Sequence, residues 1–69
     1  MMKINYDSEI NALNIRFQEG NYEKSIEVAG GIIVDYTADK KIMSIEILDA
    51  NEKIPLETIR SVQKAKSAA

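Results

Sequence analysis

Short segments in which apolar and polar residues alternate, joined by connections of a few residues, dominate the first fifty positions of this chain. An apolar residue at every second position is typical of a β-strand with one buried face. The clearest segment is 13–18, because Leu13, Ile15 and Phe17 alternate with polar residues. Similar patterns recur along the chain, and they predict strands over residues 3–6, 13–18, 25–28, 32–36 and 42–48.

The connections between these segments are too short for a parallel crossover, which needs about a dozen residues or more. They contain turn-forming residues, among them Gly20-Asn21 and Gly30-Gly31. We therefore expect each connection to be an antiparallel hairpin. The result would be a five-stranded antiparallel β-meander over about residues 2–50, with the strands side by side in chain order.

The last part of the chain has a different period. Leu56, Ile59 and Val62 recur at helical spacing, and Pro55 suits the first position of a helix, where its missing N–H is not needed. This pattern predicts a helix over about residues 55–66 that lies across one face of the sheet. The sequence as a whole predicts a single α+β domain over residues 1–69.

A chain of 69 residues has a small core. A core of this size supplies only about 3–5 kcal/mol, and small proteins often add a disulfide, a metal or a second subunit. The chain has neither Cys nor His, so a homodimer is the expected solution. Ile33, Ile42 and Leu48 lie on the otherwise polar side of their strands, and we expect them to form the interface; local packing under loops is the alternative.

The composition also limits the chemistry and the location. Without Cys or His there is no thiolate nucleophile, no Ser-His-Asp triad and no histidine ligand for zinc. The longest apolar run, residues 30–34, is too short to cross a bilayer, and no apolar segment typical of a secretory signal follows the N-terminus. We expect a cytoplasmic protein that has no membrane partner and no cofactor.

Carboxylates are the catalytic groups that remain. Asp35, Glu46 and Asp49 are the candidates for a polar surface site. A Mg²⁺ or Ca²⁺ site would use Asp35, Asp39 or Asp49, because these ions accept oxygen ligands and need no His. Acid–base chemistry requires two carboxylates close together, and Asp35 and Glu46 are not expected to be direct cross-strand neighbours. We therefore expect these residues to be solvated carboxylates rather than catalytic groups or metal ligands.

Basic residues gather toward the C-terminus, although the whole chain has a net charge of −2. Lys53, Arg60 and Lys64 could contact a nucleic acid, but proteins that bind nucleic acids usually carry a larger basic excess. A solvated helix surface is the expected role of these residues, and nucleic acid is not an expected partner.

Four segments, in this order and spacing, resemble the DUF2283 family of small prokaryotic proteins: MKINYD at 2–7, NALNIR at 11–16, GIIVDY at 31–36 and SIEILDA at 44–50. The chain departs from the family pattern at Asn11, where the family has an acidic residue, at Asn14 in place of Tyr, and at Ser44 in place of Gly. The resemblance implies a compact β-meander with a C-terminal helix and no established activity. Some relatives are encoded beside toxin-like proteins, which implies an antitoxin-like partner role.

These observations together predict a protein that is not an enzyme and that acts as a protein-interaction module. Two alternatives remain open, a metal-assisted carboxylate enzyme and a weak nucleic-acid binder.

Overall fold

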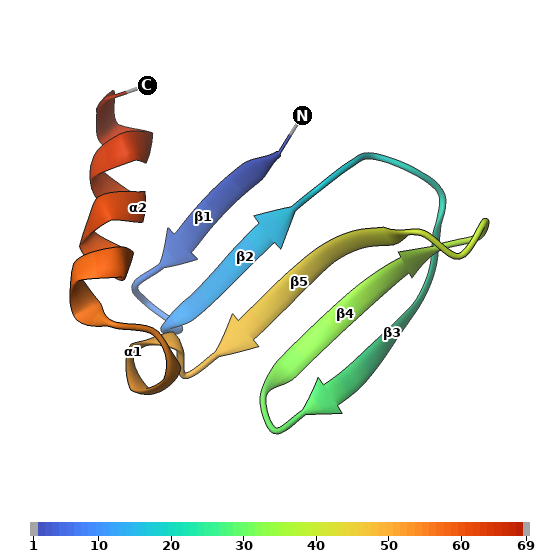
Figure 1. Cartoon of the computed structure of the whole chain (residues 1–69), viewed down its shortest axis with the longest axis horizontal. Helices are drawn as coiled ribbons and strands as arrows, with labels where there is room; N and C mark the ends of the chain where they lie inside the picture. The colour runs from blue at the N-terminus through green and yellow to red at the C-terminus, as the bar shows by residue number, and fades with distance from the viewer. Residues whose placement is uncertain (1, 69) are drawn as a thin grey trace.

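The computed structural model describes the backbone of residues 2–68 and the side chains of residues 2–64. Five strands are followed by two helices (Figure 1). Their bounds are β1 Lys3–Asp7, β2 Ala12–Arg16, β3 Tyr22–Ala29, β4 Ile32–Thr37, β5 Ile42–Leu48, α1 Ala50–Lys53 and α2 Leu56–Ala68.

The strands form one antiparallel sheet in the order β1-β2-β5-β4-β3. The predicted α+β class, the five antiparallel strands and the C-terminal helix are therefore confirmed. The predicted strands fall on the observed ones, but β3 begins three residues earlier than the alternation at 25–28 indicated. Its first residues, Tyr22 to Lys24, include a register irregularity that hides the pattern.

The predicted meander order is wrong, because β2 pairs with β5 rather than with β3. The connection over residues 17–21 was expected to be a hairpin, but it passes the ends of β5 and β4 (Figure 1). Three strand spacings amount to about 14 Å. Six extended residue steps reach about 20 Å, so this short connection is long enough to skip two strands. Strands β2 to β5 consequently form a Greek key.

Gly20 lets this connection pass close to the end of β4. A Cβ atom at Gly20 would lie 2.7 Å from Cγ2 of Thr37, whose side chain is buried. Next to it, the Ala38 N–H donates to the Asn21 carbonyl at 2.8 Å, and the Phe17 N–H donates to the Met43 carbonyl at 2.8 Å. The connection is thus fixed by backbone hydrogen bonds at both of its ends.

The helical region differs from the prediction in two respects. The short helix α1 was not predicted; it begins after Asp49, which has a φ of 51°. Helix α2 begins at Leu56, one residue later than expected, because Pro55 precedes the helix and its carbonyl accepts hydrogen bonds from the N–H groups of Thr58 and Ile59. A difference of one or two residues at helix ends is common.

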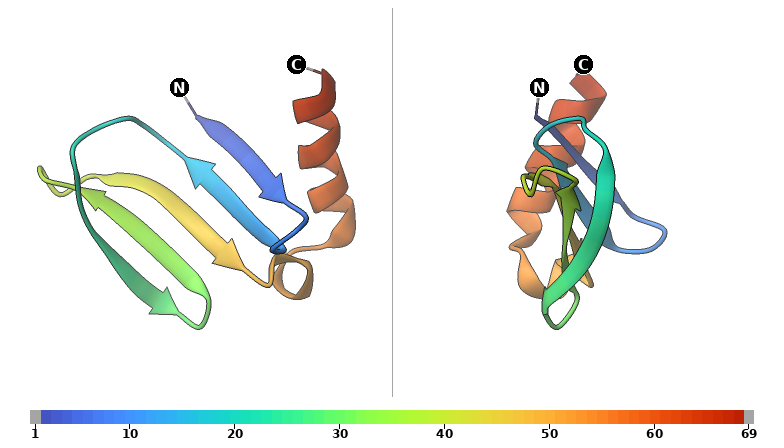
Figure 2. Two further views of the ribbon diagram at one scale, coloured as in Figure 1. Left: turned by 180° about the vertical axis from the view of Figure 1, so that it is seen from behind. Right: turned by 90° about the vertical axis from the view of Figure 1, so that its right-hand side faces the viewer.

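The core lies where the helices meet the β1–β2 side of the sheet. Leu13, Ala50 and Ile59 are buried together. The side chains packed around these three are half-buried: Tyr6, Ile47, Ile54 and Val62. Figure 2 shows α2 at the β1 side of the sheet, so that β4 and β3 have no helix beside them.

Candidate functional site

Residues that pair across neighbouring antiparallel strands project from the same face of the sheet. Tyr6, Leu13 and Ile47 are paired in this way and contact the helices, so their side of the sheet is called the helix face. The opposite side is called the polar face. A second line of paired residues on the helix face crosses all five strands and contains only aliphatic side chains: Ile4, Ile15, Ile45, Val34 and Ile26.

Helix α2 covers only one end of the helix face. Along β2 the side chains change from buried Leu13 to half-buried Ile15, and beyond the strand Phe17 is 39% exposed. All three were expected to point to one face; of these, only Leu13 is fully buried. The helix face therefore has a covered end and an open end.

The open end of the helix face spans four strands. We call it the open patch and define it by five residues on β2, β5, β4 and β3: Ile15, Ile45, Val34, Tyr36 and Ile26. Val34, on the inner strand β4, is buried, whereas Ile26 on the edge strand β3 is 41% exposed. Beside Ile26 and Tyr36 lies a shallow depression of about 260 Å³ that is also lined by Lys24 and Lys40.

The polar face carries a chain of hydrogen bonds centred on Asp35. The Ser44 hydroxyl donates to Oδ2 of Asp35 at 2.6 Å, and the Ser25 hydroxyl donates to Oδ1 at 2.5 Å. The Tyr22 hydroxyl lies 2.7 Å from that of Ser25. Asp35 is thus held by its two cross-strand neighbours, which uses both carboxylate oxygens within the sheet.

The three carboxylates proposed from the sequence do not converge on one site. Asp35 pairs with Ser44, so Glu46 occupies the diagonal position on the same face. Asp49 lies beyond the end of β5, where its backbone precedes α1 and its side chain makes no capping hydrogen bond. Within residues 2–64, no group of three or more Asp or Glu side chains is arranged to hold a metal ion.

The three isoleucine and leucine residues proposed as an interface are also divided. Ile33 and Leu48 occupy diagonal positions on the polar face and are half-buried. Ile42 is 42% exposed and pairs with Tyr36, which places it on the helix face at the other end of β5. A register irregularity in β5 after Ile42 causes this change of face. Alternation alone did not indicate this irregularity.

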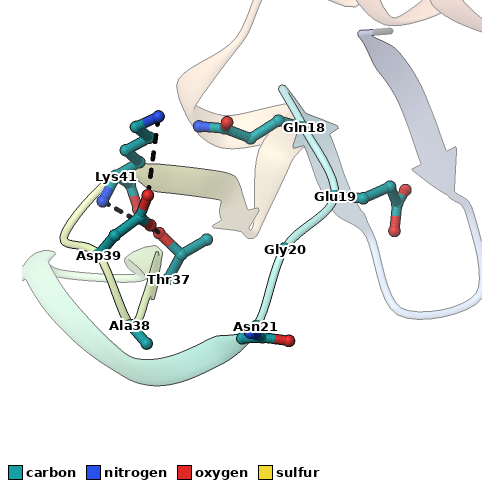
Figure 3. Close-up of a pocket in the computed structure, with 8 residues that line it drawn as sticks. All are labelled: Gln18, Glu19, Gly20, Asn21, Thr37, Ala38, Asp39 and Lys41. Atoms are coloured by element: carbon teal, nitrogen blue, oxygen red, sulfur yellow. Dashed lines mark hydrogen bonds and ion pairs between the residues drawn. The ribbon is translucent and has the colours of Figure 1, made fainter.

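A second shallow depression, of about 430 Å³, lies between the 17–21 connection and the β4–β5 turn (Figure 3). Its polar groups bond to one another and to nearby backbone. The Thr37 hydroxyl donates to Asp39 and accepts from the Lys41 N–H at 3.1 Å, and Gln18 Nε2 donates to the Ile42 carbonyl at 2.8 Å. The hydrogen bond from Thr37 lowers the pKa of Asp39 below its usual value, with a smaller contribution from the charge of Lys41. These contacts stabilise the turn.

Asn11 connects the β1–β2 turn to α1. Its Oδ1 accepts from the Tyr6 hydroxyl at 2.7 Å and from the Asn51 N–H at 3.1 Å, and its Nδ2 donates to Asn51 Oδ1. Its backbone has a φ of 53°, a conformation that Asn tolerates better than most residues. These contacts give Asn11 a structural role, because its side chain joins β1 to α1.

The basic residues are placed as follows. Lys53 Nζ donates to the carbonyl of Leu48, the last residue of β5, at 2.7 Å. Arg60 and Lys64 are exposed on α2. Across the described part of the chain, neither helix is long and apolar enough to cross a membrane.

The open patch was missed by the sequence analysis. Each of its residues shows the alternating pattern, but only the strand order brings them into one surface. The sequence pattern of the helix also does not indicate that the helix covers only one end of the sheet.

The model of the DUF2283 family, described as a protein of unknown function, matches residues 3–51. The chain therefore belongs to the DUF2283 family, as its four sequence segments indicated. Neither the curated proteins nor the solved structures gave a match.

Proposed function

We propose that this member of the DUF2283 family is a protein-interaction module without enzymatic activity, and that its contact surface is the open patch. One observation carries the proposal: a continuous line of aliphatic residues crosses the sheet, and the helix of the same chain covers only one end of it. Within the patch Ile26 is exposed, three residues are half-buried and Val34 is buried. Contiguous apolar surface that remains accessible is typical of sites that bind other proteins.

The chemistry of the other surfaces supports the same proposal. Asp35 is engaged by two serines, and Asp39 and Lys41 belong to a turn. These carboxylates contact hydroxyl groups or an ammonium group, whereas acid–base catalysis of this kind needs two carboxylates held together. The open patch is the surface whose exposure costs free energy unless a partner covers it.

An antitoxin-like role, which the family resemblance implies, is a narrower form of this proposal. In that case the partner would be a small toxin-like protein that contacts the same patch. A loss of binding on substitution of Ile26 is the result expected for both the general and the narrower form.

The proposal is tested by affinity capture from cells with three forms of the chain. We expect wild type and Ile10→Lys to retain the same partner proteins and Ile26→Lys to lose them. Ile10 is 65% exposed in the β1–β2 turn, outside the open patch, and provides a matched control for the added charge. Equal capture by all three forms would contradict the role of the patch.

A further inference from the structure

We infer that a second copy of this chain covers the open patch, in a two-fold dimer whose open patches face each other. This inference rests on the proposed function, because it names a second copy of the chain as the partner that binds the open patch. Three features of the molecule support it: the excess of exposed surface, the difference in charge between the two faces, and the off-centre position of α2.

The exposed area is larger than the mass of the chain predicts. A compact monomer of 7.7 kDa is expected to expose about 4,300 Å². This chain exposes 4996 Å². The excess of about 700 Å² is close to the area of about 800 Å² that each partner buries in a standard protein–protein interface. A contact of that size with a second copy would bring the exposed area per chain close to the expected value.

The two faces of the sheet differ in their suitability for contact with an identical surface. A two-fold interface uses the same surface patch on both subunits. On the polar face, an interface would bury the charged groups of Glu27, Glu46 and Arg16 from both copies, and burying a charge is costly unless it is paired. On the helix face, Ile15, Ile45 and Val34 would meet aliphatic side chains, as in two sheets that pack face to face about 10 Å apart.

The position of α2 determines how the copies can be oriented. The helix packs at the β1 side, and β5, β4 and β3 lie to one side of it (Figure 1). A two-fold axis perpendicular to the strands would bring the two α2 helices to the same side of the assembly, where they would hold the sheets apart. An axis parallel to the strands places the helices on opposite sides. The second arrangement lets the open patches meet.

Sedimentation equilibrium of the full chain over the micromolar range tests the inference. We expect wild type and Ile10→Lys to sediment at twice the chain mass of 7.7 kDa and Ile26→Lys to sediment as a monomer. A buried, unpaired lysine should weaken self-association by at least about tenfold. Ile26 lies on the exposed edge strand, so its substitution should leave the far-ultraviolet circular dichroism spectrum unchanged. Ile26→Ala, which adds no charge, should weaken the dimer to a smaller extent.

The outcomes separate this inference from the proposed function. A monomeric wild-type chain overturns the inference, and so does a dimer that Ile26→Lys leaves intact. If the chain is monomeric but loses a captured partner on Ile26→Lys, the proposed function stands and its partner is a different protein. If the chain is monomeric and Ile26→Lys changes no capture, both fail.

Discussion

The β1–β2 side and the β4–β3 side of the sheet have similar apolar faces but different cover. At the first side, Leu13 and Ile59 are 4% and 2% exposed because the helices pack on the sheet. At the second side Val34 of β4 is buried, but all eight residues of the edge strand β3 are exposed and Ile26 does not belong to the buried cluster. The difference shows that the helices cover the apolar face of the sheet only on the β1–β2 side. The strands on the other side carry an apolar face as well, but no helix of the same chain packs on it.

The largest effect is expected in the covered half. Ile59→Ala removes a side chain that is 2% exposed and packs with Leu13 and Ala50. Such a truncation costs about 2–5 kcal/mol through lost burial and the cavity that remains. Urea unfolding should show a large decrease in the transition midpoint. Leu56→Ala on the same helix, where the side chain is 55% exposed, is the control and should change the midpoint little. Equal effects would mean that α2 is not docked as described.

The next largest effect is expected where the turn holds α1 in place. Asn11→Ala removes the acceptor for the Tyr6 hydroxyl and the Asn51 N–H, and it places alanine at a φ of 53°. Lost hydrogen bonds and an unfavourable backbone conformation together should cost about 1–3 kcal/mol. Chemical denaturation provides the measurement.

Two further variants at position 11 separate the contribution of the backbone conformation from that of the hydrogen bonds. Asn11→Gly relieves the backbone strain but does not restore the hydrogen bonds. Asn11→Asp restores the acceptor oxygen and should recover more stability than Asn11→Gly. The reverse order would show that the backbone conformation, rather than the side chain, is the essential property of Asn11.

The sequence predicted more of the fold than of the site, and particular residues show why. The alternation of Leu13, Ile15 and Phe17 defines a strand and its face regardless of which strand lies beside it. The neighbour depends on pairing between distant segments, as in the register that joins Ile15 to Ile45, and no local pattern encodes that choice. The open patch depends on this pairing and on the reach of α2. Ile42 could not be assigned to the correct face, because an irregularity in β5 shifts the phase.

A third prediction concerns the boundary between the two halves. Ile15 lies on β2 beside Leu13 but is only half-buried within one chain. From the fold of a single chain, Ile15→Ala should cost about 1–2 kcal/mol, less than Leu13→Ala at about 2–5 kcal/mol. Arg16→Ala, on the polar face, should cost almost nothing. Unfolding curves recorded at several protein concentrations provide the measurement.

The concentration dependence makes this prediction sharper. If a second copy covers Ile15, the wild-type midpoint should rise with protein concentration, and the cost of Ile15→Ala should rise with it. The difference in unfolding free energy between wild type and Leu13→Ala should not change with protein concentration in this way. Parallel behaviour of the two variants would contradict the distinction between covered and open ends.

The smallest effect is expected at the β4–β5 turn, which belongs to neither apolar region. The hydrogen bond from Thr37 lowers the pKa of the Asp39 carboxyl in the folded protein below the ordinary value of 3.8. A group with a lowered pKa stabilises the fold above its unfolded pKa, and this contribution disappears as the pH falls through the folded value. The change therefore lies below pH 3.8.

A carboxyl titration followed by NMR should show the lowered pKa in wild type and in Thr37→Ser, which keeps the hydroxyl. In Thr37→Val the pKa should return toward 3.8. An unchanged pKa in Thr37→Val would assign the shift to Lys41, whose ammonium lies 3.6 Å from Asp39, and Lys41→Gln would then be the variant that raises it.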